Sequence, residues 1–409
     1  MIAPTNQDGR RDLPIGRRVA QLRVRRGMSQ QVLADRVGRS KSWVDKVERG
    51  VRTLDRLVMI ETVAAALGVA PGVLVGRKVH RAPATDVTAA VERVREALAC
   101  YDTPGTAGRD WPPSLAELDH QVGYACTAYR HAHHPQVLRM LPGLLAAARH
   151  AARTEASTAG ARPATGLLVR VYRLTAQTLV KLGEAHLGWL AADRAMTTAA
   201  GDPRRTARAA VPLAQALRAL NRGRLATTAA TTAAHPLDPA PSSPPDVLAL
   251  AGTLLTEAAL AAATYADAAT VDDLLDRAAH FAAAHAKHHC HDNDGFGPVV
   301  VNLAYALTAA RLGDNHLAIA LHQHATSGDA WQRLPAEHRA AHLIDIARAH
   351  LDVGDQHAAG RALVTADHIA PAEVRLRPTA HTVLNAVLRA GPTPADVTRL
   401  ATTIGLARA

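Results

Sequence analysis

Residues 28–50 read MSQQVLADRVGRSKSWVDKVERG, and this stretch decides the fold of the first part of the chain. Ser29 is a favourable N-cap for a helix over QQVLADRV, which a glycine ends. Ser40 caps the next helix, which carries Val44 and Val47 on its inward face and also ends at a glycine. The stretch therefore predicts two short helices joined by a tight turn.

Further helices are predicted on both sides of this stretch. Residues 15–27 (IGRRVAQLRVRRG) repeat apolar side chains at helical spacing and end at Gly27, and residues 54–68 (LDRLVMIETVAAALG) do so again. A last short helix is expected at Pro71–Val75. Five short helices in about 60 residues, with a tight turn after the second, are typical of a helix-turn-helix module.

The segment from about Gly16 to Leu74 also resembles the helix-turn-helix of the XRE/Cro-like repressor family. The shared features are Ser-Gln at the start of the second helix, Leu-Ala inside it and Val-Glu-Arg-Gly at the close of the third. The resemblance implies that Lys41–Arg49 is a recognition helix that enters the major groove of double-stranded DNA. It also implies that Arg23 and Glu48 form a semi-buried salt bridge that holds this helix in place.

Residues near the start of the recognition helix are expected to contact an operator. Lys41 and Ser42 should meet base edges, and Lys46 should reach the same groove one turn later, since lysine donates to guanine O6 and N7. Gln30 should contact a phosphate. Trp43 either packs on a thymine methyl or sugar, or covers the core of the module itself. The predicted DNA-binding set is Gln30, Arg39, Lys41, Ser42, Trp43, Lys46 and Arg49.

Charge separates this module from the remainder of the chain. The 409 residues carry a net charge of +11, and residues 1–81 alone, with 17 basic and 7 acidic side chains, account for nearly all of it. A small basic domain on a nearly neutral body is typical of a nucleic-acid binder. The sequence shows neither a signal peptide nor an uncharged apolar span of membrane length, and it has three scattered cysteines. A cytoplasmic protein without a membrane partner is expected.

The body is predicted to be all-α, since 48% of residues are hydrophobic, only 3% are aromatic and no useful strand alternation appears. The expected domains are a flexible N-terminus (1–14), the helix-turn-helix module (15–79), a linker (80–86) and a helical body (87–409). The expected helices of the body span 87–100, 113–133, 136–155, 165–182, 184–199, 204–221, 224–234, 246–265, 268–289, 298–312, 314–327, 336–352, 356–369, 372–390 and 394–405.

These helices repeat in pairs. LGEAHLGWLAADRA, LGDNHLAIALHQHA and VGDQHAAGRALVTA share one pattern, in which Gly183, Gly313 and Gly354 mark turns between helices. Gly183 and Gly223, like Gly313 and Gly354, are separated by about 40 residues, a period typical of helical solenoids. The pattern resembles tetratricopeptide repeats. An ordinary helical bundle with chance glycine spacing is the alternative.

A second resemblance lies near the C-terminus, in FGPVVVNLAYALTAARLGD, in a Leu-Pro before an arginine-containing helix, and in IAPAEVRLRP. These segments are similar to actinobacterial regulators that join an XRE-type domain to a tetratricopeptide-like region. The use of 42 arginines against 5 lysines agrees with that source. A solenoid lines its concave face with the first helix of each pair. Polar residues at helical spacing there indicate a ligand site of Arg170, Arg173, Gln177, Asn302 and Tyr305, suited to a peptide or an acidic small molecule; the alternative is that these polar stripes face bulk water.

Histidines gather at 131–134 and 285–291, and His285 and His289 have a spacing that could bind a metal. No zinc motif surrounds them, so a solvated, pH-responsive surface is favoured, and no metal or cofactor is predicted. The sequence also lacks phosphate-loop, nucleophile-elbow and dinucleotide motifs, which argues against an enzyme. We therefore expect a homodimeric transcriptional regulator whose body senses a peptide, small-molecule or protein effector. The alternatives are an interaction scaffold that binds DNA non-specifically and a metal-dependent sensor or enzyme.

Overall fold

The computed structural model describes residues 15–25, 28–54, 57–67, 74, 84–100, 113–156, 161–287 and 295–406. The chain divides into two compact units, Met1–Asp86 and Val87–Ala409. Every regular element in the described ranges is a helix, so the predicted all-α class is confirmed. The predictions for residues 1–14 and Gly27, and for 71–75 apart from Leu74, fall outside these ranges.

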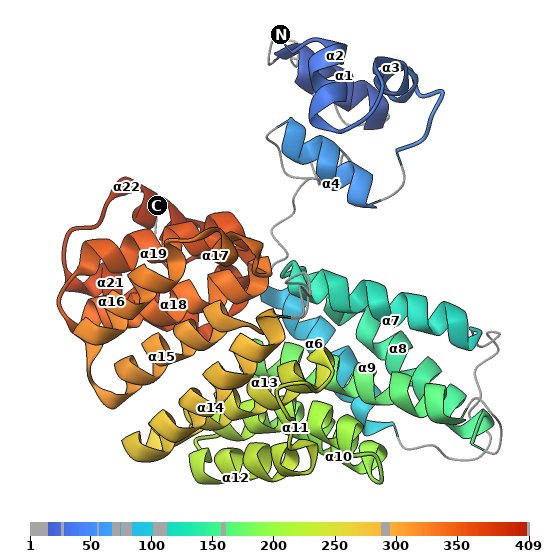
Figure 1. Cartoon of the computed structure of the whole chain (residues 1–409). Coiled ribbons are helices and arrows are strands. Elements are labelled where there is room, and N and C mark those ends of the chain that lie inside the picture. The colour runs from blue at the N-terminus through green and yellow to red at the C-terminus, as the bar shows by residue number, and fades with distance from the viewer. Residues whose placement is uncertain are drawn as a thin grey trace. The chain divides into compact units, whose positions relative to one another are not determined.

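The first unit packs four described helices around a small apolar core. They are α1 (Ile15–Arg25), α2 (Gln30–Arg36), α3 (Lys41–Glu48) and α4 (Leu57–Ala66), drawn in dark to mid blue in Figure 1. Each helix contributes apolar side chains at helical spacing, and the core also includes Leu74. The buried apolar side chains are Val19, Leu33, Ala34, Val37, Val44, Val47, Leu54, Ile60, Val63, Ala64, Leu67 and Leu74.

The second unit consists of helices joined mostly by short turns (Figure 1). In chain order, they are α6 (Ala84–Ala99), α7 (Leu115–Arg130), α8 (His134–Thr154), α9 (Ala161–Lys181), α10 (Ala185–Ala199), α11 (Pro203–Ala219), α12 (Gly223–Ala234), α13 (Pro245–Ala262), α14 (Ala268–Ala286), α15 (Pro298–Leu312), α16 (Asn315–Thr326), α17 (Asp329–Arg333), α18 (Ala336–Asp352), α19 (Gln356–Ile369), α20 (Pro371–Leu376), α21 (Pro378–Ala390) and α22 (Ala395–Ile404).

Six helix pairs share one turn geometry. The pairs are α7–α8, α9–α10, α11–α12, α13–α14, α15–α16 and α18–α19. A residue with positive φ stands in each turn, and the second helix begins two residues later; these residues are Ala132, Gly183, Asn221, Ala266, Gly313 and Gly354. The N–H of the next residue donates to a carbonyl five residues back, as from Glu184 to Leu179 at 2.9 Å. This is the hydrogen bond of a Schellman turn, and it repeats along the body.

Gly223 corrects one detail of the predicted repeat. The turn between α11 and α12 is made by Asn221, and Gly223 is instead the first residue of α12. A Cβ atom at Gly223 would lie 2.1 Å from Thr264 Oγ1 and 3.0 Å from the Ala261 carbonyl oxygen. Gly223 is therefore required by the close approach of α12 to the end of α13, whereas asparagine tolerates the left-handed turn conformation.

Small side chains let the paired helices pack closely. Alanine supplies much of three core clusters, which centre on α6–α10, α11–α15 and α15–α22. Figure 1 shows α15, α16, α18 and α19 running side by side. Among the described residues, Pro245–Tyr265 is long and apolar enough to cross a membrane, but 78% of its most apolar 18-residue stretch is buried inside the fold. It is therefore placed as a core helix of the body.

Three predicted helices, 298–312, 336–352 and 356–369, have the observed ends. The predicted helix at 372–390 is wrong, because Pro378 has no N–H to donate and starts a new helix after Arg377. The five-residue α17 was not predicted at all. Helix α6 begins at Ala84, inside the expected linker of 80–86.

Candidate functional site

Helix α3 in the first unit exposes polar residues on one face. The Ser40 hydroxyl accepts a hydrogen bond from the Trp43 N–H at 3.2 Å, which caps the helix where the sequence predicts. Val44 and Val47 are buried, whereas Lys41, Ser42 and Lys46 are exposed. The helix thus presents two lysines and a hydroxyl to solvent while its apolar side is fixed in the core.

A tight turn sets the direction of α3. Gly38 has a φ of +63°, a conformation that favours glycine. The Arg39 N–H donates to the Ala34 carbonyl at 2.9 Å and closes the turn. Leu33 and Ala34 anchor α2 in the core on the other side. The turn therefore holds α2 and α3 at a fixed angle.

Arg23 and Glu48 join α1 to the end of α3. Arg23 Nε and Nη2 donate to the two carboxylate oxygens of Glu48 at 2.6 and 2.9 Å, and Arg23 Nη1 donates to the Met28 carbonyl at 2.7 Å. The hydrogen bond to Glu48 raises the pKa of Arg23, although burial opposes this. The pair implied by the sequence resemblance is present, and it is a two-pronged contact that fixes geometry as well as charge.

Two residues that support this contact had not been recognised from the sequence in that role. Gln30 Nε2 donates to Glu48 Oε2 at 2.9 Å, so its side-chain amide is engaged within the unit instead of pointing to a phosphate. A Cβ atom at Gly16 would lie 2.0 Å from the Val47 carbonyl oxygen, because α1 crosses close to α3 at this point. The expected phosphate contact of the Gln30 side chain thus conflicts with the hydrogen bond that it makes here.

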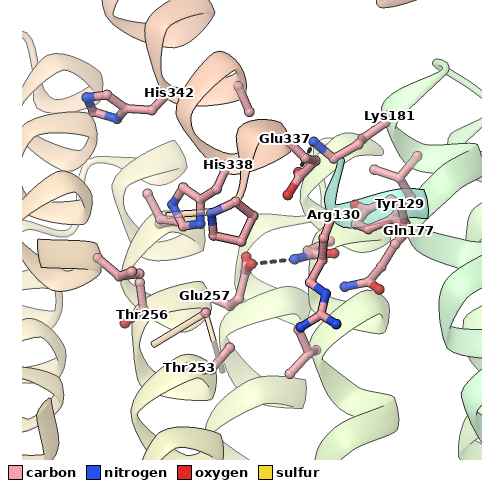
Figure 2. Close-up of a pocket in the computed structure, with 18 of the residues that line it drawn as sticks. Tyr129, Arg130, Gln177, Lys181, Thr253, Thr256, Glu257, Glu337, His338 and His342 are labelled. Carbon is pink, nitrogen blue, oxygen red and sulfur yellow. Dashed lines mark hydrogen bonds and ion pairs between the residues drawn. The ribbon is translucent and has the colours of Figure 1, made fainter. Parts of the chain in front are cut away.

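The second unit contains a cavity of about 810 Å³ (Figure 2). It is lined by the first helix of all six pairs, together with the segment before α15 and residues around α18. The polar lining residues are Cys126, Tyr129, Arg130, Arg170, Arg173, Gln177, Lys181, Gln215, Arg218, Thr253, Thr256, Glu257, Glu337, His338, His342, Asp345 and Arg377. This agrees with the expectation that first helices line the concave face of the repeat.

Ion pairs tie the walls of the cavity together. Lys181 on α9 pairs with Glu337 on α18, a contact drawn as a dashed line in Figure 2, and lies 3.1 Å from Glu373. Arg218 on α11 pairs with Glu257 on α13 at 3.0 Å. These contacts join helices that are distant in sequence, so they fix the spacing of the cavity walls.

Three of the five predicted ligand residues lie at this cavity, and two do not. Arg170, Arg173 and Gln177 line it from α9. Asn302 is exposed, and the Tyr305 hydroxyl donates to Asp276 at 2.6 Å, outside the cavity lining. The α15 face that lines the cavity is apolar and includes Leu303 and Leu307, so the expectation for Asn302 and Tyr305 is corrected: their side chains leave the helix on another face.

Two ionisable groups are enclosed at the α18 side of the cavity. Burial raises the pKa of Tyr129 well above its usual value, and the negative charges of Glu337 and Glu373 add to this effect. Burial lowers the pKa of His338, which also lines the cavity. Both groups are therefore held neutral near pH 7, and each adds a polar but uncharged surface to the cavity.

The predicted solvated histidine surface is only partly correct: His131 is exposed and His133 partly exposed, but two other histidines of these clusters are buried. His134 is buried and its Nε2 lies 2.6 Å from Glu373 Oε1. His285 is buried against Phe296, whereas His288, His289 and His291 fall outside the described residues. Within the described ranges, no three histidine, cysteine or acidic side chains gather in a way that could hold a metal ion.

Comparison with known proteins identifies the first unit. Residues 14–77 match the family model of a helix-turn-helix domain. The first unit contains a helix-turn-helix domain. No curated protein sequence matches the chain. Among solved structures, the chain is similar to Bacillus thuringiensis PlcR, crystallised with the peptide PapR7 and DNA, at 11% identity and a TM-score of 0.29 over 67% of this chain and 97% of that one.

The other predicted interface residues of the helix-turn-helix domain fall into two groups. Arg39 and Arg49 are exposed; Arg49 forms a surface ion pair with Asp45 at 2.6 Å, and an Arg39 nitrogen lies 3.7 Å from the Met59 sulfur. Trp43 is half-buried and packs against the core of the domain. Of the two roles left open for Trp43, this packing favours the structural one.

Proposed function

We propose that this chain is a cytoplasmic DNA-binding transcriptional regulator, whose helix-turn-helix domain reads an operator and whose helical body binds an effector and dimerises. The observation that carries the proposal is the placement of α3. This helix exposes Lys41, Ser42 and Lys46, and the Arg23–Glu48 ion pair joins its C-terminal end to α1. A rigidly held helix with exposed donors suits the reading of base edges in a major groove.

The charge distribution supports nucleic acid as the partner of this domain. Residues 1–81 hold nearly all of the net charge of +11, and the phosphate backbone attracts such a surface without regard to sequence. One domain of this kind covers one half-site only. Two domains on half-sites about 34 Å apart need a dimeric protein, and for this reason we propose that the body dimerises.

The cavity supports a sensing role for the body. It is concave, contains both charged and apolar walls, and at about 810 Å³ falls within the range of small-molecule and peptide sites. An effector acts on DNA binding only if it prefers one arrangement of the two DNA-binding domains. We therefore place the effector in the cavity and the response in the arrangement of the dimer.

Selection of DNA from a random pool by the full-length protein tests this function. The selected sequence should bind at least about a thousandfold more tightly than random DNA at the same salt concentration. It should contain two half-sites about one helical turn apart, and the protein should sediment as a dimer. Equal affinity for selected and random DNA would instead support a scaffold that binds DNA non-specifically.

A further inference from the structure

Arg173 is an unpaired cation in the wall of the cavity. It lies in the middle of α9, and within the described part of the chain it makes no hydrogen bond and no ion pair. Its Nε atom is fully buried without a partner. Burial is the main cause that lowers the pKa of Arg173 to about 10; Cys126 opposes it, and the charges of Arg208 and Arg170 add smaller lowering effects. A buried charge without a counter-charge destabilises a fold.

Other basic side chains of the cavity show the contrast. Arg170 pairs with Asp119, Arg218 with Glu257, and both Lys181 and Arg377 with Glu373. Each of these cations has a carboxylate within ion-pair distance. Arg173 has none, although it lies on the same helix as Arg170 and Lys181. The fold therefore neutralises these neighbours and leaves the guanidinium of Arg173 without a counter-charge.

The surroundings of Arg173 combine charge with an amide and an apolar wall. Gln177, one helical turn along α9, and Arg130 on α7 both extend into the cavity in Figure 2. The lining also includes apolar side chains that remain partly exposed, among them Leu307 on α15, Pro335 before α18 and Ala341 on α18. A guanidinium presents several donors to a carboxylate or phosphate, and the amide adds another, while the apolar wall favours hydrocarbon.

We propose that the cavity binds a ligand with one anionic group, a carboxylate or a phosphate, held by Arg173, and an apolar portion that packs against the partly exposed side chains of Leu307, Pro335 and Ala341. The anionic group of the ligand supplies the counter-charge that no carboxylate of the described residues provides for Arg173. This inference rests on the proposed function only in taking the cavity as the effector site. It adds the chemical class of the effector and the residue that selects it.

Binding of matched probes to the full-length protein tests the proposal. The anionic probes are octanoate, octyl phosphate and N-acetyl-leucyl-leucine with a free carboxylate, and the neutral counterparts are octanol and the dipeptide amide. Affinity is measured by calorimetry at one fixed ionic strength. At least one anionic probe should bind at least tenfold more tightly than its neutral counterpart, and the strongest of the three identifies the head group. Equal binding of anionic and neutral probes would overturn the proposal.

Arg173→Gln separates ligand binding from a structural role. The variant should lose at least tenfold in affinity for the preferred anionic probe. Its melting temperature without ligand should stay close to that of the wild type, because Arg173 is partly exposed and forms no ion pair that the substitution would break. Arg277→Gln, which changes an exposed arginine on α14, should alter neither property. A lower melting temperature for Arg173→Gln, or unchanged probe affinity, would show that Arg173 is not the anion site.

Operator affinity distinguishes this failure from failure of the proposed function. If the protein binds DNA specifically and this binding responds to a small-molecule extract of cells, but none of the anionic probes binds, the anion site is wrong and the proposed regulatory function stands. If anion binding depends on Arg173 but the protein shows no sequence-specific DNA binding, the anion site stands and the proposed regulatory function is wrong.

Discussion

His134 and Glu373 are separated by 239 residues in the sequence, yet His134 Nε2 lies 2.6 Å from Glu373 Oε1 with both side chains fully buried. His134 begins α8 in the first helix pair, and Glu373 lies in α20, after the last pair. Helices α7 and α18 are also in direct contact. The body is therefore closed by a contact between its two ends, and Lys181, Glu337 and Glu373 form part of that closure beside the cavity.

The charge state of Glu373 should control the acid stability of the body. Burial alone would raise the pKa of Glu373, but Lys181, the hydrogen bond from His134 and Arg377 outweigh it and hold this pKa well below the usual range. A lowered carboxylate pKa gives stability that is complete above the unfolded value, about 4.5, and is lost as the pH falls below it. Glu373→Gln should lower the unfolding free energy by about 3–5 kcal/mol at pH 7.

Chemical denaturation at pH 7 and at pH 3.5 measures this effect. The difference between wild type and Glu373→Gln should be smaller at pH 3.5, because the wild type loses part of its advantage there. Asp273→Asn is the control, since it removes an exposed carboxylate that pairs with Arg277 on the surface of α14. A difference that stays the same at both pH values would contradict the assigned role of the Glu373 charge.

The lysines of α3 should determine sequence preference. Lys41→Ala and Lys46→Ala should each reduce affinity for the selected operator by about 1–3 kcal/mol and affect random DNA less, because a base contact carries sequence information. Fluorescence anisotropy with both DNAs at one salt concentration measures the difference. Arg52→Ala, an exposed arginine beyond α3, is a control that should weaken binding to both DNAs by similar factors. Equal losses on both DNAs for Lys41→Ala would reject the recognition-helix assignment.

Substitutions in the contacts that hold α3 against α1 should weaken binding to all DNA sequences alike. Arg23→Met leaves the buried carboxylate of Glu48 without its main counter-charge, so the helix-turn-helix domain should lose about 3 kcal/mol of stability. Binding to operator and random DNA should fall together, because the geometry of the whole helix is lost. Asp45→Asn, which breaks an exposed pair with Arg49, should cost less than about 1 kcal/mol. Circular dichroism melting of the domain transition provides the measurement.

Helix positions were predictable wherever strong end signals flank a regular apolar pattern. The helix at 298–312 lies between a proline at its start and Gly313 at its end, and the sequence gives both ends correctly. Three of the six turns are not marked by glycine, because Ala132, Asn221 and Ala266 adopt the same positive φ. A search for glycine spacing therefore finds the repeat but misses half of its turns. Asn221 tolerates this conformation, whereas the surrounding Schellman hydrogen bonds and packing hold Ala132 and Ala266 in a conformation that alanine disfavours.

The site was only partly predictable, because it depends on contacts between distant segments. Periodicity places Arg170, Arg173 and Gln177 on one stripe, and the structure brings that stripe to the cavity. The same reasoning fails for Tyr305, since a polar stripe on a helix does not say which neighbour it meets. The closure through His134 and Glu373 has no local sequence signal at all. Sequence patterns thus predict the helices and the polar stripes along them, whereas the cavity depends on how the helices pack against one another.

Two glycines within body helices should respond oppositely to substitution. A Cβ atom at Gly252 in α13 would lie 2.0 Å from the ring of Phe296, so Gly252→Ala should destabilise the body by about 1–3 kcal/mol. Gly166 in α9 has open space at the same position, and Gly166→Ala should stabilise by about 0.5–1 kcal/mol. Melting temperatures of the two variants measure this difference. A gain in stability for Gly252→Ala would show that Phe296 moves without strain.

His322 and His342 should make the body sensitive to pH in a second, higher window. His322 Nδ1 lies 3.0 Å from His342 Nε2, so one of these two nitrogens donates a hydrogen bond and the other accepts it. Burial lowers the pKa of His322 to about 4, with a smaller contribution from His350, and lowers that of His342 well below its usual value, helped by His322 and His338.

A lowered histidine pKa means that the unfolded chain takes up protons first as the pH falls. Between pH 6.5 and about 4, unfolding should therefore become easier, by roughly 3 kcal/mol for His322 alone, and His342 should add to this in the same direction. Replacing both residues, as His322→Gln and His342→Gln, should reduce the slope of the stability profile in this window, while His338 and His350, whose pKa values burial also lowers, retain part of it. The loss below pH 4.5 that Glu373 causes should remain. Denaturant unfolding at half-unit pH steps separates the two windows, and an unchanged slope between pH 6.5 and 4.5 in the double variant would show that other groups control this range.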